Sequence, residues 1–324
     1  MSDPQQNLRN AVAILRRGGL VAFPTETVYG LGADAANPAA LARLYAVKGR
    51  PQRHPVIVHL ACADWLRDWT RDVPEYARKL AAAFWPGPLT LVLKRLQVVA
   101  DAITGGQDTV GLRVPAHSMA LALLGAFGGG IAAPSANRFG RVSPTTAAHV
   151  REDLGGDVDL VLDGGPCAVG IESTIVDASG GAPVILRPGQ ITSGDIERVA
   201  GLAPAKPAGS VPRAPGTLAA HYAPRAPLQL VGAKDWEDVL RRQSGTRLAV
   251  MSFRPEPSRL RCGDWIRAAS DPERFAHDLY ANLRRLDGSG SDIIVVEAPP
   301  DEPRWAGVND RLARAARGDM PSAP

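Results

Sequence analysis

Apolar residues follow two different spacings in the first two hundred positions. Leu8, Val12 and Leu15 recur at helical spacing, and two glycines at 18 and 19 then predict the end of a helix. Short apolar runs bounded by turn residues predict buried strands instead. These runs cover residues 20–23, 56–59, 89–94, 110–114, 131–133, 160–162, 174–176 and 184–186.

Helical patterns separate some of these strands, whereas only turns separate others. Pro38 after Asn37 predicts a helix start, and further helices are expected over residues 117–124 and 145–154. A strict alternation of strand and helix would predict a parallel sheet. The observed mixture predicts an α/β fold with a twisted, mixed sheet and helices packed on it.

The composition changes in residues 203–227, which contain six prolines. Proline fixes φ and removes a backbone donor, so this stretch predicts a stiff, extended linker. A plain spacer would not need His221 and Tyr222, and we expect the linker to close on the active site. We therefore divide the chain into a catalytic domain (1–202), this linker (203–227) and a second domain (228–324).

The second domain shows strands and helices in alternation. Strands are expected over residues 228–231, 247–251 and 293–296, and helices over 234–242, 273–286 and 309–317. Such alternation predicts a small, Rossmann-like α/β domain with a mainly parallel sheet.

The charge balance and the spacing of the cysteines argue against several classes of protein. The chain of 324 residues carries 37 Lys+Arg against 33 Asp+Glu, which permits a polyanionic ligand but lacks the strong basic excess typical of nucleic-acid binding. Cys62, Cys167 and Cys262 are far apart, so we expect neither a disulfide nor a metal site. The polar start and the absence of a run of about 20 apolar residues predict a cytoplasmic protein without membrane contact.

The sequence has no convincing glycine-rich motif for binding a nucleotide. Residues 30–35 fit G-x-G-x-x-A, but six residues separate them from the preceding strand and no helix begins there. Residues 24–30 place two hydroxyls and a carboxylate just past that strand, where α/β proteins bind ligands; a plain polar loop is the alternative. Lys48 and Arg50 end a helix, either as a solvated cap or as ligands for phosphate oxygens.

Cations and small hydroxyls gather at several other strand ends. Arg113 lies between apolar residues, where a buried charge needs a partner, and a substrate carboxylate or phosphate would supply one. Ser135 and Asn137 follow one strand, and Ser143 precedes Pro144 at an expected helix start that would favour anions. Together these groups predict binding of anionic ligands and adenylyl chemistry.

Seven runs of this sequence are similar to the YrdC-like family of threonylcarbamoyl-AMP synthases, in the family's order over residues 8–200. The runs are FPTETVYGLGADA, KGRPQRHPVIVHL, FWPGPLTLVL, VGLRVP, APSANRFGRVSPT, IESTIVD and LRPGQIT. The linker PGTLAAHYAP and the second domain resemble the family's long, two-domain form. This resemblance implies that L-threonine, bicarbonate and ATP, with Mg²⁺ carried by ATP, give threonylcarbamoyl-AMP and pyrophosphate.

The resemblance also implies roles for single residues. Contacts to L-threonine are expected from Thr27, His59, Arg113, Ala133 and Ser173. Contacts to ATP are expected from Arg50, His54, Thr109, Ser135, Asn137, Ser143, Arg187 and Tyr222. Lys48, Arg50 and Arg187 are the candidates that stabilise charge on the phosphates during reaction. Many relatives have Asn where this chain has His54.

The family's product passes to a separate threonylcarbamoyl transferase complex, which modifies an adenosine beside the tRNA anticodon. Transient contact with tRNA is compatible with the sequence. Two alternatives remain at this point: an RNA-binding module without catalysis, and carbamoyl-adenylate chemistry in hydrogenase maturation. The near balance of charge and the three scattered cysteines count against them.

Overall fold

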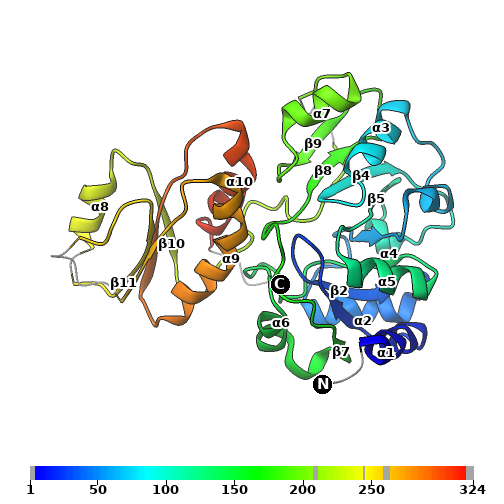
Figure 1. The fold of residues 1–324 in the computed structure, drawn as a ribbon, viewed down its shortest axis with the longest axis horizontal. Coiled ribbons are helices and arrows are strands. Elements are labelled where there is room, and N and C mark those ends of the chain that lie inside the picture. The colour runs from blue at the N-terminus through cyan, green and yellow to red at the C-terminus, as the bar shows by residue number, and fades with distance from the viewer. Residues whose placement is uncertain (1–3, 207–210, 244, 258–262, 319–324) are drawn as a thin grey trace. The chain divides into compact units, whose positions relative to one another are not determined.

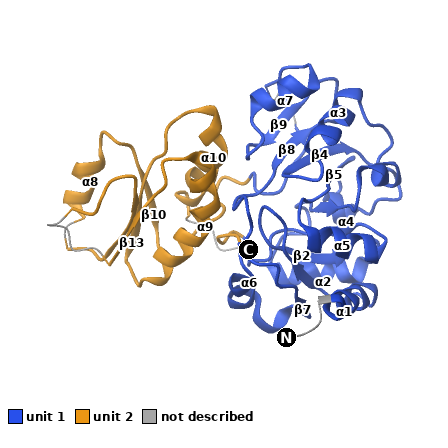
Figure 2. Cartoon of the chain, viewed as in Figure 1, with its two compact units in different colours: residues 1–139, 144–217 blue, residues 140–143, 218–324 orange. Residues whose placement is uncertain are grey.

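The computed structural model describes residues 4–206, 211–243, 245–257 and 263–318. These residues form two compact units, one made of residues 1–139 and 144–217 and the other of residues 140–143 and 218–324 (Figure 2). The expected linker, 203–227, is divided between the units after Thr217. Its residues 207–210 lie outside the described part, as does Cys262.

The first unit is built on a mixed sheet with the strand order β7-β1-β2-β6-β3-β5-β4-β8-β9 (Figure 1). The described strands are β1 (Val21–Phe23), β2 (Gly30–Asp34), β3 (Ile57–His59), β4 (Leu89–Lys94), β5 (Thr109–Arg113), β6 (Ile131–Ala132), β7 (Leu160–Val161), β8 (Thr174–Asp177) and β9 (Val184–Arg187). Parallel pairs such as β3 with β5 alternate with antiparallel pairs such as β4 with β5. The predicted mixed sheet is confirmed.

Side chains cap several helices of the first unit. They are α1 (Pro4–Arg16), α2 (Pro38–Lys48), α3 (Glu75–Phe84), α4 (Asp101–Thr104), α5 (Ser118–Phe127), α6 (Ala147–Leu154) and α7 (Ser193–Ala200), with 3₁₀ turns η1 (Ala63–Asp68) and η2 (Gly155–Asp157). In α2, the Asn37 side chain accepts from two backbone N–H groups and Gly49 ends the helix at φ 63°. The cap therefore fixes the position of Lys48 at the last turn.

The strand β2 was not predicted from the sequence, because its GLGAD residues lack the bulky side chains typical of strands. Gly32 lies so close to the Phe23 ring and to Ile131 that an added Cβ would come within 2.9 Å of both. Close packing in a strand therefore explains this glycine.

Alternation along the strands separates two apolar layers. Val21 and Phe23 of β1 pack with Leu15 of α1 and Leu123 of α5 on one face of the sheet. Ala22 joins the larger cluster on the other face, together with residues of α2 and α3. Helices α1 and α5 lie side by side over the first face (Figure 1). Helices α1 and α5 cover the part of this face that is formed by β1 and its neighbours. The candidate site lies on another part of the same face.

The second unit contains the parallel sheet β10-β13-β11-β12. Its described elements are β10 (Leu228–Val231), α8 (Trp236–Arg242), β11 (Leu248–Ser252), β12 (Asp264–Arg267), α9 (Pro272–Gly288), β13 (Ile293–Glu297), η3 (Pro303–Trp305) and α10 (Ala306–Ala315). The small α/β domain expected from the sequence is confirmed. Across the described residues of both units, no helix has the length and apolarity needed to cross a bilayer.

Candidate active site

Strand register brings the predicted residues of β3, β5 and β9 onto one face of the first unit's sheet. His59 of β3 pairs with Arg113 of β5, and Arg187 of β9 pairs with Ile175 of β8. Because directly paired residues share a face, and residues two apart along a strand do too, Thr109 and Gly111 lie on the same face as Arg113. The sequence predicted only that these residues lie at strand ends. The strand pairing shows that they also share one face of the sheet.

Arg113 is held from three sides although only 4% of the residue is exposed. Its Nε donates to the Gly87 carbonyl (3.2 Å), and its Nη1 donates to Thr27 Oγ1 (2.9 Å). Its Nη2 lies 2.7 Å from Glu26 Oε1. The expectation that a substrate anion supplies the partner of this buried charge is therefore incomplete, since Glu26 of the same chain already balances it.

Arg187 and Ser173 form a second contact group on this face. Arg187 Nε and Nη2 donate to the Ser173 carbonyl at 3.1 and 2.9 Å, and Nη2 also reaches Ser173 Oγ at 3.2 Å. Ser173 Oγ lies 2.8 Å from Thr90 Oγ1, within hydrogen-bond distance. Thr90 of β4 is fully buried and directly follows Leu89, which pairs with Thr174. The three side chains thus make one connected polar network.

Lys48 does not act as a solvated helix cap, because only 2% of it is exposed. Its Nζ donates to the carbonyls of Ser135 (2.5 Å) and Asn137 (2.7 Å), which ties the end of α2 to the loop after β6. Burial, and secondarily the charge of Arg50, holds the pKa of Lys48 well below its usual value. Lys48 therefore shapes the loop that carries Ser135 and Asn137.

Arg50, His54 and Phe139 lie next to one another. Arg50 Nη2 donates to the Pro55 carbonyl (2.7 Å), and its guanidinium lies 5.6 Å from the Phe139 ring centre. The His54 ring is 5.7 Å from the same ring. Burial, then the nearby charges of Arg50 and Arg213, lower the pKa of His54. The charges of Arg50 and Arg213 near His54 make this corner electropositive, which favours an anion.

His59 is neutral at physiological pH. Burial, reinforced by the positive charge of Arg113, lowers its pKa to about 3. Its ring packs edge-on against Phe23 at 5.9 Å. A neutral imidazole next to Arg113 adds hydrogen-bonding capacity without adding charge.

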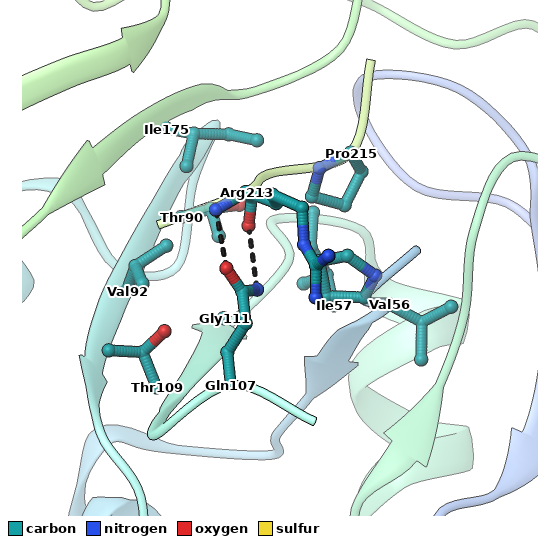
Figure 3. Close-up of a pocket in the computed structure, with 11 residues that line it drawn as sticks. Val56, Ile57, Thr90, Val92, Gln107, Thr109, Gly111, Ile175, Arg213 and Pro215 are labelled. Atoms are coloured by element: carbon teal, nitrogen blue, oxygen red, sulfur yellow. Dashed lines mark hydrogen bonds between the residues drawn. The ribbon is translucent and has the colours of Figure 1, made fainter. Parts of the chain in front are cut away.

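The first part of the linker lies on this same face. Ala214 is buried against Ile57, Val92 and Ile175. Figure 3 shows the Gln107 side chain facing the Arg213 backbone, which it contacts in both directions: Gln107 Nε2 donates to the Arg213 carbonyl (3.1 Å) and Arg213 N donates to Gln107 Oε1 (2.6 Å). The pocket between linker and sheet is lined by Pro55, Val56, Ile57, Thr90, Val92, Gln107, Thr109, Gly111, Ile175, Arg213 and Pro215.

Arg187 joins its network to the linker, because its Nη1 donates to the Pro215 carbonyl at 3.0 Å. The predicted ATP residue Thr109 lines the same pocket. Ala133 N, a predicted threonine contact, donates to the Ile57 carbonyl at 2.9 Å. Of the predicted strand residues, Thr109 lines this pocket, whereas His59, Arg113 and Arg187 share its sheet face without lining it.

Ser143 and Tyr222 belong to the second unit. The expectation that a helix starts at Ser143 is wrong: α6 begins at Ala147, because the Thr146 side chain accepts from His149 N and caps it. Tyr222 has φ 61°, stacks on Tyr280 at 5.9 Å and carries the Arg311 guanidinium 5.3 Å above its ring. Their contacts with ATP stay predictions.

The sequence did not predict a role in the site for three residues that contact it in the structure. Glu26 stood in a quoted motif, but only the structure pairs it with Arg113. Thr90 lies within the apolar run of β4, two residues before Val92, and only the pairing of Val92 with Gly111 places it on the face of Arg113. Gln107 sits in a turn with no pattern that points to residue 213.

The described residues hold no cluster of three or more His, Cys, Asp or Glu side chains placed to bind a metal ion.

Comparisons with known proteins cover both units. A family model described as "Telomere recombination" matches residues 13–189, and one described as "Threonylcarbamoyl-AMP synthase, C-terminal domain" matches residues 191–317. The threonylcarbamoyl-AMP synthase of Pyrococcus abyssi is 41% identical over 322 residues, covering 95% of this chain and 94% of that protein. That of Bacillus subtilis is 40% identical over 329 residues, covering 98% and 94%.

A solved structure has the same fold over its full length. The crystal structure of P. abyssi Sua5 complexed with L-threonine superposes with a TM-score of 0.89 at 37% sequence identity. The match covers 98% of this chain and 96% of that one. The similarity therefore extends through the linker region and the smaller domain, and is not limited to the larger sheet.

Proposed function

The chain belongs to the threonylcarbamoyl-AMP synthase family, and on that premise we propose how its residues make the adenylate. The enzyme joins L-threonine, bicarbonate and ATP into L-threonylcarbamoyl-AMP and releases pyrophosphate. The product serves the N6-threonylcarbamoyladenosine modification of tRNA. The observation that supports the proposal most is the shared sheet face of Arg113 and Arg187, which places two buried cations in one region.

The amino acid binds, in this proposal, at the Arg113 end of the face. Arg113 takes the α-carboxylate, because a guanidinium matches a carboxylate in geometry and charge. Thr27 and the neutral His59 complete the polar wall beside it. Ser173 and the loop backbone at Ala133 close the subsite.

The nucleotide binds, in this proposal, where Arg50 and Arg187 border the pocket. Lys48 holds the loop of Ser135 and Asn137, whose hydroxyl and amide then face the phosphates. His54 and Thr109 serve as further contacts near the linker. Mg²⁺ would arrive as part of the ATP substrate and would neutralise part of the phosphate charge.

Two steps follow from this placement. The amine of L-threonine attacks bicarbonate carbon and water leaves, which gives a carbamate. A carbamate oxygen then attacks the α-phosphorus, and pyrophosphate leaves with the bonding electrons. Negative charge grows on phosphate oxygens in the second step, where Arg50, Arg187 and Lys48 stabilise it. Holding the reactants in line supplies much of the remaining acceleration.

The linker acts as a lid in this proposal. Residues 211–217 lie on the site face, and Gln107 and Arg187 hold their backbone. Because an adenylate hydrolyses readily, a segment that covers the pocket would protect it from water. Substrates enter and products leave when this segment lifts. The ATP contacts of Ser143 and Tyr222, which the resemblance implies, stay predictions.

We propose that the reaction takes place in the cytoplasm, where ATP and L-threonine are available. Cys62 and Cys167 are both free thiols, in keeping with a reducing compartment. The adenylate passes to a threonylcarbamoyl transferase complex. Contact with tRNA is transient in this scheme, since the transferase carries out the modification.

The test is to identify the product. ATP, bicarbonate and L-threonine are incubated with the protein, and the adenylate is analysed by mass spectrometry. Threonylcarbamoyl-AMP is the expected species. Formation of carbamoyl-AMP from carbamoyl phosphate would instead indicate the chemistry of hydrogenase maturation. Salt-sensitive RNA binding with no adenylate would indicate a non-catalytic RNA-binding module.

A further inference from the structure

Arg213 is an exposed residue at the edge of the pocket between the linker and the sheet, and Figure 3 draws it with the other residues that line this pocket. Its Nη2 donates to the Gly105 carbonyl at 2.7 Å. Within the part of the chain that the structure describes, no carboxylate is paired with this guanidinium. Arg213 therefore offers further N–H donors at a place that a ligand can reach from solvent.

The backbone of Arg213 is held independently of its side chain. Both hydrogen bonds between Gln107 and Arg213 involve the main chain of Arg213. Ala214, the next residue, is buried in a cluster with Ile57. The linker therefore presents the guanidinium from a fixed point. A substitution that changes only the Arg213 side chain leaves both hydrogen bonds with Gln107 in place.

A second cation lies close to Arg213. Gly105, which accepts the hydrogen bond from Arg213, is so near the backbone of residues 53–55 that an added Cβ would lie 2.3 Å from a carbonyl oxygen there. The last carbonyl of this segment accepts from Arg50 Nη2 at 2.7 Å. Burial first, and then the charges of both arginines, lower the pKa of His54 in the same segment. Two guanidinium groups thus act on one corner, and they favour a ligand with more than one negative charge.

The place of this corner along β5 decides which part of ATP can reach it. Thr109 and Arg113 lie four residues apart on one face of that strand, about 13 Å at a rise of about 3.3 Å per residue. In the proposed function the amino acid and the α-phosphorus meet toward Arg113, whereas Gln107 and Arg213 lie at the Thr109 end. The adenosine and the outer phosphates both extend away from the α-phosphorus. Because only the outer phosphates are anionic, the two arginines favour them.

We propose that Arg213 is the linker residue that binds the β- and γ-phosphates of ATP, which leave as pyrophosphate. Arg213 lies outside the sequence runs that are similar to the family, so the resemblance assigns it no role. The proposal rests on the proposed function and deepens it. ATP holds the linker over the site through its outer phosphates, and this hold ends when pyrophosphate departs.

The test compares inorganic pyrophosphate with AMP as ligands of the full chain and of the variant Arg213→Gln. AMP shares the nucleoside and the α-phosphate with ATP but lacks the outer phosphates. The variant is expected to bind pyrophosphate about tenfold more weakly, or worse, and to bind AMP as before, because it loses a charge-assisted hydrogen bond to phosphate. Isothermal titration calorimetry measures both affinities. Unchanged pyrophosphate affinity in the variant, or no pyrophosphate binding by the unmodified protein, overturns the proposal.

Steady-state kinetics provides a second measurement. Arg213→Gln should raise KM for ATP about tenfold and leave KM for L-threonine unchanged. Arg213→Lys should recover part of the loss, since lysine restores the charge but not the fork geometry. Lys206→Gln, at an exposed cation earlier in the same linker, is the matched control and should behave like the unmodified protein.

Two further outcomes are distinguishable. Equal weakening of AMP and pyrophosphate in Arg213→Gln would overturn the proposal in favour of a purely structural role in the linker. Unmodified protein that makes no adenylate would contradict the proposed function itself, whereas the pyrophosphate titration would still decide whether Arg213 binds phosphate.

Discussion

The side-chain amide of Gln107 pairs with the backbone of Arg213 through two hydrogen bonds of opposite direction, as two neighbouring strands do. This contact joins residues 106 positions apart in the chain, one beside β5 and one in the linker. It fixes where the linker crosses the site face, and Pro215 then lies within reach of Arg187. The opening and closing of the pocket should therefore depend on Gln107.

The variant Gln107→Ala removes both of these hydrogen bonds without touching the proposed substrate contacts. We expect kcat/KM for ATP to fall by up to about thirtyfold, because two neutral hydrogen bonds contribute about 1 kcal/mol each. Steady-state pyrophosphate release measures the effect. Gln97→Ala, at an exposed glutamine in a neighbouring loop, is the matched control and should behave like the unmodified protein. A Gln107 variant with unchanged kcat/KM would show that this contact does not govern the pocket.

The variant Arg187→Ala removes a buried cation that donates to both Ser173 and Pro215. A loss of about tenfold to a hundredfold in kcat/KM is expected, because hydrogen bonds from a charged group contribute about 1.5–3 kcal/mol each. Arg187→Lys should recover only part of the activity, since lysine cannot reproduce the fork geometry. Arg198→Ala on α7, at a 67% exposed side chain, should have no effect. Full activity of Arg187→Ala would exclude a catalytic role for this arginine.

The variant Thr90→Val keeps the side-chain shape and removes the hydroxyl that meets Ser173 Oγ. Ser173 then loses a partner that orients it. We expect KM for L-threonine to rise about two- to tenfold while KM for ATP stays constant, in line with the loss of one neutral hydrogen bond. The two KM values are determined separately under saturation of the other substrate. A larger effect on ATP than on L-threonine would contradict the proposed placement of the amino acid.

Stability should depend on pH through His59. Its pKa of about 3 in the folded chain is below the ordinary value of 6.5, so the unfolded chain binds a proton first as the pH falls. The contribution is fully present above about pH 6.5 and is lost progressively toward pH 3. Urea unfolding at pH 7.5, 6 and 5 should show a smaller decline for His59→Asn than for the unmodified protein. Identical declines would mean that His59 does not titrate as described.

Strands with bulky apolar residues were predictable from the sequence, whereas small-residue elements were not. Short apolar runs bounded by turn residues located β4 and β10 at their observed bounds. The strand β2 escaped prediction because its glycines are selected by contact with Phe23, a tertiary effect that local propensity does not contain. The helix start at Ser143 was misplaced because Thr146, three residues further on, provides the better cap.

The candidate site was predictable as a set of residue types but not as a set of contacts. Motifs named Arg113 and Arg187, but their common face depends on the register of β3, β5, β8 and β9, which is settled only by strand pairing. The sequence also left open whether the Lys48 side chain is exposed to solvent or binds phosphate oxygens. Its observed hydrogen bonds to the carbonyls of Ser135 and Asn137 instead show a side chain buried against the loop after β6.

The central claim is that one pocket of the first unit joins an amino acid to the α-phosphate of ATP. Pyrophosphate release from ATP and bicarbonate, measured with and without L-threonine, tests this most directly. The account predicts release that rises strongly when L-threonine is added and that is reduced at least about tenfold by Arg113→Ala. Release that is independent of L-threonine, or that survives unchanged in Arg113→Ala, would contradict it.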